Sequence, residues 1–141
     1  MNQPHDNPPE HFQLREGYAS FDPAGVVSLE KAVALVTSAL LFAREQSIRL
    51  LLVDGTRLTG FPSPSVADRY WIVRQWATDS QNRVEVAFAL QRYLIDPDRF
   101  GIQVAVNLGM RADVFESRAE ALAWLLSGAD PYPLAASRST K

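Results

Sequence analysis

The chain has 141 residues, which suits one domain, and its 47% hydrophobic and 21% charged content is typical of an ordinary globular protein. A formal net charge of -2 disfavours a nucleic-acid binder, which usually needs a clustered basic surface. The sequence contains no cysteine, and this excludes disulfides, thiolate metal sites and a cysteine nucleophile.

Both ends of the chain are polar and contain several prolines. We expect residues 1–11 to be a disordered lead-in, residues 12–128 to form one domain, and residues 129–141 to be a disordered tail. The first residues lack the pattern of a signal peptide, and no apolar run is long enough for a membrane span. These features predict a cytoplasmic protein of bacterial type.

The domain is predicted to open with a β-hairpin. Phe12–Arg15 and Tyr18–Asp22 have the pattern of two short strands, and Pro23–Gly25 is expected to form a turn after them. Next, Ser28 is a good N-cap, and apolar residues at helical spacing predict a helix over residues 29–46. The apolar run Ile48–Val53 is typical of a central strand covered on both faces.

A loop and a second helix follow this strand. Ser63 and Pro64 are predicted to be the N-cap and the first residue of the helix, because proline is favoured at that position. The face of this helix that packs on the sheet is expected to carry the apolar residues Val66, Tyr70, Val73 and Ala77.

The rest of the domain continues to alternate strands and helices. Its predicted elements are a strand at Val84–Leu90, a helix from Asp96 to about Leu108, a strand at Val114–Phe115 and a helix from Ser117 to Gly128. Ser117 and Glu120 form a capping box at the start of the last helix. Strands that alternate with helices imply a mainly parallel sheet, so we predict an α/β fold with about five strands, four helices and an antiparallel hairpin at one edge.

Four segments stand out in this order of elements, namely "LLLVDGTRLTGFPSPS", "RVEVAFAL", "IDPDRFGIQVAVNLG" and "VFESRAEALAWL". With these segments, the order resembles the STAS domain of anti-sigma-factor antagonists and sulfate transporters, and in particular a bacterial STAS-like subgroup. The resemblance covers roughly residues 12–128. It implies regulation by contact with a protein partner, often switched by phosphorylation.

In the antagonists, the loop after the central strand resembles Asp-x-Ser, a short spacer and then Asp-Ser-Ser-Gly, with the second serine of that group phosphorylated. Asp54 and Thr56 match the first part in kind, but residues 62–65 read Pro-Ser-Pro-Ser. The resemblance therefore makes Ser63, Ser65 and Thr56 candidate phosphoacceptor or anion-binding residues in a degenerate motif. Taken by itself, Ser63 is interpreted as a helix cap.

Gly55 and Gly60 have the spacing of the two glycines in a phosphate-binding loop. Phe61 and Pro62 stand where the loop needs lysine and then serine or threonine, so we reject a nucleotide hydrolase and predict no cofactor. We keep the hypothesis of a weaker anion site at the start of the second helix, since free N–H groups point outward there.

Asp54 ends the predicted central strand, where open α/β sheets often bind ligands. It could act as a general base, but such an aspartate more often bonds the backbone of its own loop, and we favour that structural role. The two histidines, His5 and His11, lie in or beside the lead-in and offer no recognisable metal site.

Trp71 is predicted to fall outside the buried stripe of the second helix, close to Asp68 and Arg74. An aromatic residue flanked by arginine is typical of a protein contact surface, with a protein partner or a second copy as its occupant. Alternatively, the lead-in or a neighbouring loop covers it.

Two hypotheses follow. The first is a non-enzymatic interaction or regulatory module. The second is a protein that binds a small apolar ligand or an anion, or an enzyme, at the loop around Asp54. A deep apolar pocket with converging polar groups would favour the second hypothesis, and a filled interior with a flat apolar patch would favour the first.

Overall fold

A computed structural model of the chain describes residues 7–131. The predicted lead-in and tail therefore lie partly outside the described residues, at 1–6 and 132–141. None of the helices within 7–131 is long and apolar enough to cross a membrane.

The centre of the fold is a five-stranded sheet in the order β1–β2–β4–β6–β7. Its strands are β1 (Phe12–Leu14), β2 (Ala19–Phe21), β4 (Leu50–Asp54), β6 (Glu85–Ala89) and β7 (Ala112–Phe115). The β1–β2 pair is antiparallel and the other neighbours are parallel, so the predicted α/β class and the hairpin edge are confirmed. All the parallel strands point their carboxyl ends to the same edge of the sheet, where the candidate site lies.

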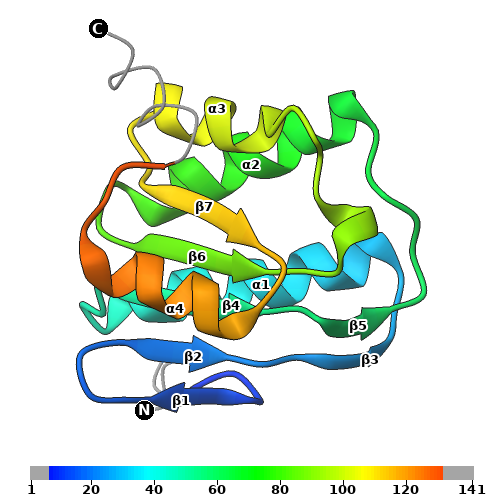
Figure 1. Cartoon of the computed structure of the whole chain (residues 1–141). Coiled ribbons are helices and arrows are strands. Elements are labelled where there is room, and N and C mark those ends of the chain that lie inside the picture. The colour runs from blue at the N-terminus through cyan, green and yellow to red at the C-terminus, as the bar shows by residue number, and fades with distance from the viewer. Residues whose placement is uncertain (1–6, 132–141) are drawn as a thin grey trace, which may run out of the picture.

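Helices cover both faces of this sheet (Figure 1). The described residues form α1 (Leu29–Glu45), α2 (Val66–Ser80), α3 (Phe100–Asn107) and α4 (Arg118–Ser127). Figure 1 shows α4 in front of the sheet and the other three helices behind it. The sheet is therefore the middle layer of three.

The alternation of side chains along the central strands divides the core into two clusters. In β4, Leu51 and Val53 belong to the larger cluster under α1, α2 and α3, whereas Leu52 between them packs on the α4 side. In β6, Phe88 belongs to the larger cluster and Ala87 to the smaller one. Because both faces are buried, these strands read as continuous apolar runs.

The predicted turn at Pro23–Gly25 was wrong, because Ala24–Val26 forms a short strand, β3. It pairs in parallel with β5 (Arg57–Thr59), which lies inside the segment that the sequence suggested was only a loop. Gly60 ends β5 with a φ of +105°, and an added Cβ would lie 2.6 Å from the Val27 carbonyl oxygen. This close approach of two backbones explains why glycine stands there.

Two helix starts differ from the prediction. The N-cap of α2 is Ser65, whose Oγ accepts a hydrogen bond from the Asp68 backbone N–H at 3.1 Å, and not Ser63. Asp96 does not begin α3 directly. Its carboxylate accepts the Phe100 N–H at 2.8 Å and so holds a turn that precedes the helix. A 3-10 helix, η1 (Arg92–Leu94), lies between β6 and this turn. The capping box at Ser117 is present, because its Oγ accepts the Glu120 N–H at 3.1 Å.

Candidate functional site

Asp54 lies at the end of β4 in a small polar cluster. Its Oδ1 accepts hydrogen bonds from the Thr56 backbone N–H at 3.1 Å and from Thr56 Oγ1 at 2.6 Å. Its Oδ2 accepts one from Arg118 Nη1, at the start of α4, at 3.3 Å. The same nitrogen donates to Asp22 Oδ1 at 2.8 Å. Arg118 thus bridges the two carboxylates that end β2 and β4.

These contacts keep Asp54 ionised. Burial opposes the charged form, but the hydrogen bonds from Thr56, together with Arg118, outweigh it and hold the Asp54 pKa below its ordinary value of 3.8. The two carboxylates hold the pKa of Arg118 above its ordinary range, although burial acts against this. A carboxylate with a lowered pKa, whose two oxygens accept three hydrogen bonds, is a poor general base. This geometry fits the structural role that we favoured for Asp54.

The loop after Asp54 does not present a cradle of free amides. The Gly55 N–H donates to the Ala89 carbonyl at 2.8 Å, and the Leu58 N–H donates to the Gly55 carbonyl at 3.1 Å. Thr56 uses its N–H on Asp54. Because the N–H groups of Gly55, Thr56 and Leu58 are bonded within the chain, they are not free to bind an anion. Gly60 instead allows the close packing of β3 on β5.

The candidate phosphoacceptors Ser63, Ser65 and Thr56 do not lie in one environment. Ser65 caps α2, and Thr56 donates to Asp54. Ser63 is exposed, and its Oγ accepts a hydrogen bond from Arg69 Nη2 at 2.6 Å. Phosphorylation of any of them stays a prediction.

The inward face of α2 is rotated relative to the predicted stripe. Val66 is 64% exposed and Tyr70 36% exposed, so these two assignments to the sheet face were wrong. Ala77 is buried and Val73 packs against the core, as expected. Trp76 completes this inward face, where it stacks on Phe88 and donates from Nε1 to Thr37 Oγ1 at 3.0 Å.

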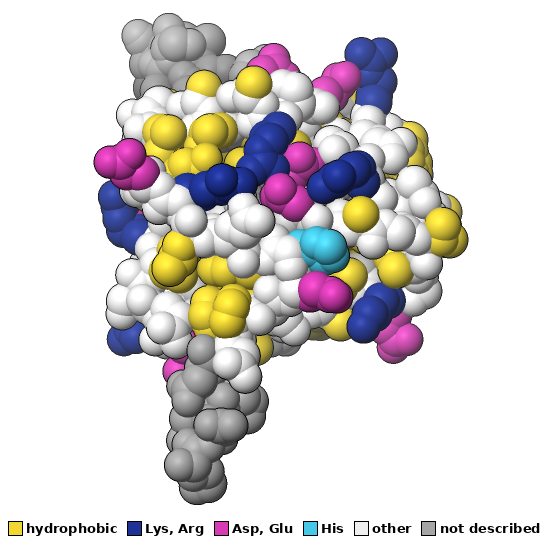
Figure 2. Space-filling model, turned by 90° about the horizontal axis from the view of Figure 1, so that it is seen from below, with side chains coloured by type: hydrophobic (Ala, Val, Ile, Leu, Met, Phe, Trp, Pro, Cys, Tyr) yellow, Lys and Arg dark blue, Asp and Glu magenta, His cyan; other side chains and the backbone are white. Residues whose placement is uncertain are grey.

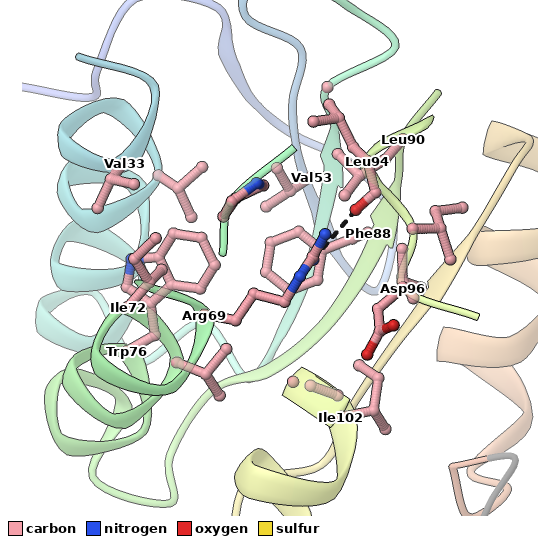
Figure 3. Close-up of a pocket in the computed structure, with 18 of the residues that line it drawn as sticks. Val33, Val53, Arg69, Ile72, Trp76, Phe88, Leu90, Leu94, Asp96 and Ile102 are labelled. Atoms are coloured by element: carbon pink, nitrogen blue, oxygen red, sulfur yellow. Dashed lines mark hydrogen bonds between the residues drawn. The ribbon is translucent and has the colours of Figure 1, made fainter. Parts of the chain in front are cut away.

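An apolar cavity of about 160 Å³ lies between this face of α2, α1, α3 and the sheet (Figure 3). Val53 and Phe88 of the sheet form its floor, with Val33 of α1 and Ile72 and Trp76 of α2 at the side, as Figure 3 shows. Because the polar groups on its wall are few, the cavity is suited to an apolar occupant.

A more accessible part of the cavity wall lies near the carboxyl ends of β4 and β6, and we call it the mouth. Lining residues on the sheet are buried, whereas Phe61, Pro64 and Arg69 on the side of α2 are half-buried. Two side-chain hydrogen bonds connect the opposite edges of this mouth. Tyr93 Oη of η1 donates to the Phe61 carbonyl at 3.1 Å, and Arg69 Nη1 donates to the Leu94 carbonyl at 3.1 Å.

Charged side chains also reach this cavity, namely Arg69, Asp96 and Arg99. Asp96 accepts backbone N–H groups at the start of α3, and Arg99 pairs with the buried Asp113 of β7. Arg69 spans from α2 towards η1, as Figure 3 shows, and its two hydrogen-bond partners are neutral oxygens. Among residues 7–131 no carboxylate forms an ion pair with Arg69.

Sequence reasoning missed the cavity and Arg69. Apolar periodicity gave no reason to place Arg69 on a cavity wall, because a charged residue normally lies outside an apolar stripe. The signal that could have found it is its position three residues before Ile72 and seven before Trp76, on the same side of a helix.

The outward face of α2 carries a cluster that we call the Trp71 face, made of Val66, Asp68, Tyr70, Trp71 and Arg74. Trp71 is 61% exposed, so the prediction that it lies off the buried stripe is confirmed. Its ring packs edge-on against Tyr70 at 5.1 Å, and the Arg74 guanidinium lies 5.4 Å from the ring centre. No contact within residues 7–131 buries it.

The surface on the side of β1 and β2 differs from the Trp71 face. Figure 2 shows basic and acidic side chains next to one another across it, with hydrophobic side chains in small separate patches. This interleaving gives no extended field of one sign. Within the described part of the chain, no group of three or more His, Asp or Glu side chains is placed to hold a metal ion.

No family model, curated protein or solved structure matched this chain. The resemblance to STAS domains therefore stays a prediction.

Proposed function

We propose that this protein binds a small apolar ligand in the cavity between α1, α2, α3 and the sheet. The observation that carries this proposal is an apolar space of about 160 Å³ with a mouth at the carboxyl ends of the parallel strands. An engineered apolar cavity of about 150 Å³ in another protein stays free of water and binds benzene. The present cavity has room for a ligand with one ring or a short chain.

The polar cluster at Asp54 supports binding over catalysis at the neighbouring loop. Its carboxylate is ionised and bonded to Thr56 and Arg118, and the loop amides donate within the chain. These groups shape the edge of the sheet beside the cavity mouth, where Gln91 Nε2 also donates to the Thr56 carbonyl at 2.9 Å. The cluster thus positions the segment that borders the cavity.

Titration of the protein with toluene, followed by backbone amide NMR, tests this proposal. We expect saturable chemical-shift changes confined to residues around the cavity, with a Kd on the order of 1 mM or tighter. The affinity is modest because a ligand with few atoms can gain only a limited binding free energy. Absence of saturable shifts in these residues would refute the proposal.

Matched variants on α1 locate the binding. Ala32 lines the cavity, whereas Ala34 on the same helix is exposed. Ala32→Leu should fill part of the space, keep the fold and weaken toluene binding at least tenfold. Ala34→Leu should leave the affinity unchanged. Equal effects of the two substitutions would show that toluene binds elsewhere.

We propose self-association through the Trp71 face as a second function. An exposed tryptophan beside Tyr70 and Arg74 has the composition of an interface centre. Asp68 and Arg74 lie three residues on either side of Trp71. If two copies of α2 pair antiparallel around a two-fold axis at Trp71, each Arg74 faces the Asp68 of the other copy. This charge complementarity favours a second copy as the occupant.

Sedimentation velocity across a range of protein concentrations tests the second proposal. We expect a monomer–dimer equilibrium that Trp71→Ala weakens about thirtyfold, the effect of losing an interface anchor. The charge reversal Arg74→Asp should weaken it too, and adding Asp68→Arg should restore it. A monomer at every concentration would exclude this interface.

A further inference from the structure

Arg69 is a cation on the wall of an apolar cavity. Its side chain is half-buried and lines the space together with Leu94 and Trp76. The guanidinium donates at 3.1 Å to the Leu94 carbonyl and at 2.6 Å to Ser63 Oγ, and both acceptors are neutral. A guanidinium carries five N–H donors, so three of them are not used by these two bonds.

The other charged side chains of the cavity are engaged differently. Arg99 pairs with Asp113 and also donates to the Val114 carbonyl at 3.0 Å. Both carboxylate oxygens of Asp96 accept backbone N–H groups, from Phe100 at 2.8 Å and Asp98 at 3.3 Å. Of the two arginines on the cavity wall, Arg69 is therefore the one without an ionic partner within residues 7–131.

We infer that the natural ligand is an anionic amphiphile, a carboxylate on a single ring or a short apolar chain, whose carboxylate binds Arg69 while its apolar part fills the cavity. This inference rests on the proposed ligand-binding function and specifies its ligand class. Arginine presents parallel N–H donors that match the two oxygens of a carboxylate. The position of Arg69 at the half-buried mouth leaves the anionic end towards solvent and directs the apolar end to Val53 and Phe88.

A pair of probes with the same skeleton separates the charge from the apolar part. We would measure the Kd of 3-phenylpropionate and of 3-phenylpropanol by calorimetry at neutral pH. The wild-type protein should bind the acid about tenfold more tightly than the alcohol, because a hydrogen bond to an ionised group is stronger than a neutral one.

Arg69→Gln should abolish this preference and leave the affinity for the alcohol within about twofold. Arg83→Gln is the matched control, since it removes the same charge at an exposed arginine just after α2 that neither lines the cavity nor belongs to the Trp71 face. It should leave both affinities unchanged. Far-ultraviolet circular dichroism shows whether each variant keeps the fold.

The outcomes separate this inference from the proposed function. If the wild type binds both probes equally, the anionic ligand is wrong and the apolar site stands. If it binds toluene but neither probe, the anionic ligand is likewise wrong. If it binds neither the probes nor toluene, the proposed function itself is wrong. Should Arg69→Gln fail to fold, the side-chain nitrogen signals of Arg69 in the wild type decide. They should shift with the acid and not with the alcohol, and equal shifts with both probes would overturn the inference.

Discussion

At the scale of single residues, Thr56 sets the charge state of Asp54. Its hydroxyl donates to Asp54 Oδ1 at 2.6 Å, and the Asp54 side chain is only 12% exposed. Thr56→Val removes this donor and keeps the shape of the side chain. We expect the Asp54 pKa to rise towards 3.8 and the free energy of unfolding at pH 7 to fall by about 1 to 2 kcal/mol.

The pH dependence of this loss follows from the direction of the shift. A lowered folded-state pKa contributes stability above the unfolded pKa, and this contribution disappears as the pH falls through the folded pKa. The difference between wild type and Thr56→Val should therefore shrink as the pH falls below 3.8. Urea unfolding from pH 7 to pH 3 measures it, with Thr56→Ser, which keeps the hydroxyl, as the control. A difference that grows in acid would contradict the role of the ionised carboxylate.

Local contacts of this cluster could be predicted from the sequence, and distant ones could not. An aspartate whose carboxylate accepts a hydrogen bond from the backbone N–H two residues later forms a common type of turn. The structural interpretation of Asp54 therefore followed from its neighbours in the sequence. Arg118 lies 64 residues from Asp54 and 96 from Asp22. Only the pairing of β2 with β4 and the position of α4 bring these three residues together.

At the scale of elements, the β3–β5 pair depends on Gly60. An added Cβ there would lie 2.6 Å from the Val27 carbonyl oxygen and 2.9 Å from the Val27 nitrogen, and the residue has positive φ. We expect Gly60→Ala to reduce stability by about 2 to 3 kcal/mol, because strain and a backbone clash add.

Gly25 in β3 provides the matched control. Its φ is +127°, but nothing lies within 4 Å of an added Cβ. Gly25→Ala therefore tests strain without the clash and should cost about 1 kcal/mol less than Gly60→Ala. Thermal unfolding of both variants measures the difference, and equal losses would show that the backbones do not approach as closely as described.

Among the elements, the sequence pattern failed to predict the first residue of α2 and the side of α2 that packs on the sheet. Ser63 and Ser65 both precede the helix, and the serine–proline signal selected the wrong one as cap. The stripe through Val66 and Tyr70 looked apolar, but the inward face passes through Arg69, Val73 and Trp76. A long arginine stem can cover apolar surface, so residue type alone did not define the buried side.

At the scale of the whole molecule, one sheet serves two cores. The α/β class and the mainly parallel sheet with its antiparallel edge could be predicted because alternating strands and helices have few arrangements. The cavity could not be predicted, since it is the space left where α1, α2 and α3 meet imperfectly over the sheet, and no sequence period encodes a void. Figure 1 shows α4 on the opposite face, so the cavity does not interrupt the smaller cluster.

Because β4 and β6 contribute alternate residues to both clusters, the two sides of the sheet should unfold together. Trp124 of α4 tests this coupling. It packs on Phe115, lies 3.8 Å below the Arg111 guanidinium and donates to the Asp130 carbonyl at 3.2 Å, but it is only half-buried. Trp124→Ala should therefore cost about 2 to 3 kcal/mol, less than the roughly 3 to 5 kcal/mol for a fully buried tryptophan.

The coupling is measured with Trp76, which lies on the face of the sheet opposite to α4. In a Trp71→Phe background, Trp124→Ala leaves Trp76 as the remaining tryptophan, and this residue stacks on Phe88 beside the cavity. The urea midpoint of Trp76 fluorescence should fall as far as the midpoint of far-ultraviolet circular dichroism, because loss of packing under α4 weakens the sheet that both clusters share. A Trp76 transition that stays in place while circular dichroism shifts would mean that the two faces unfold independently and that the shared strands do not couple them.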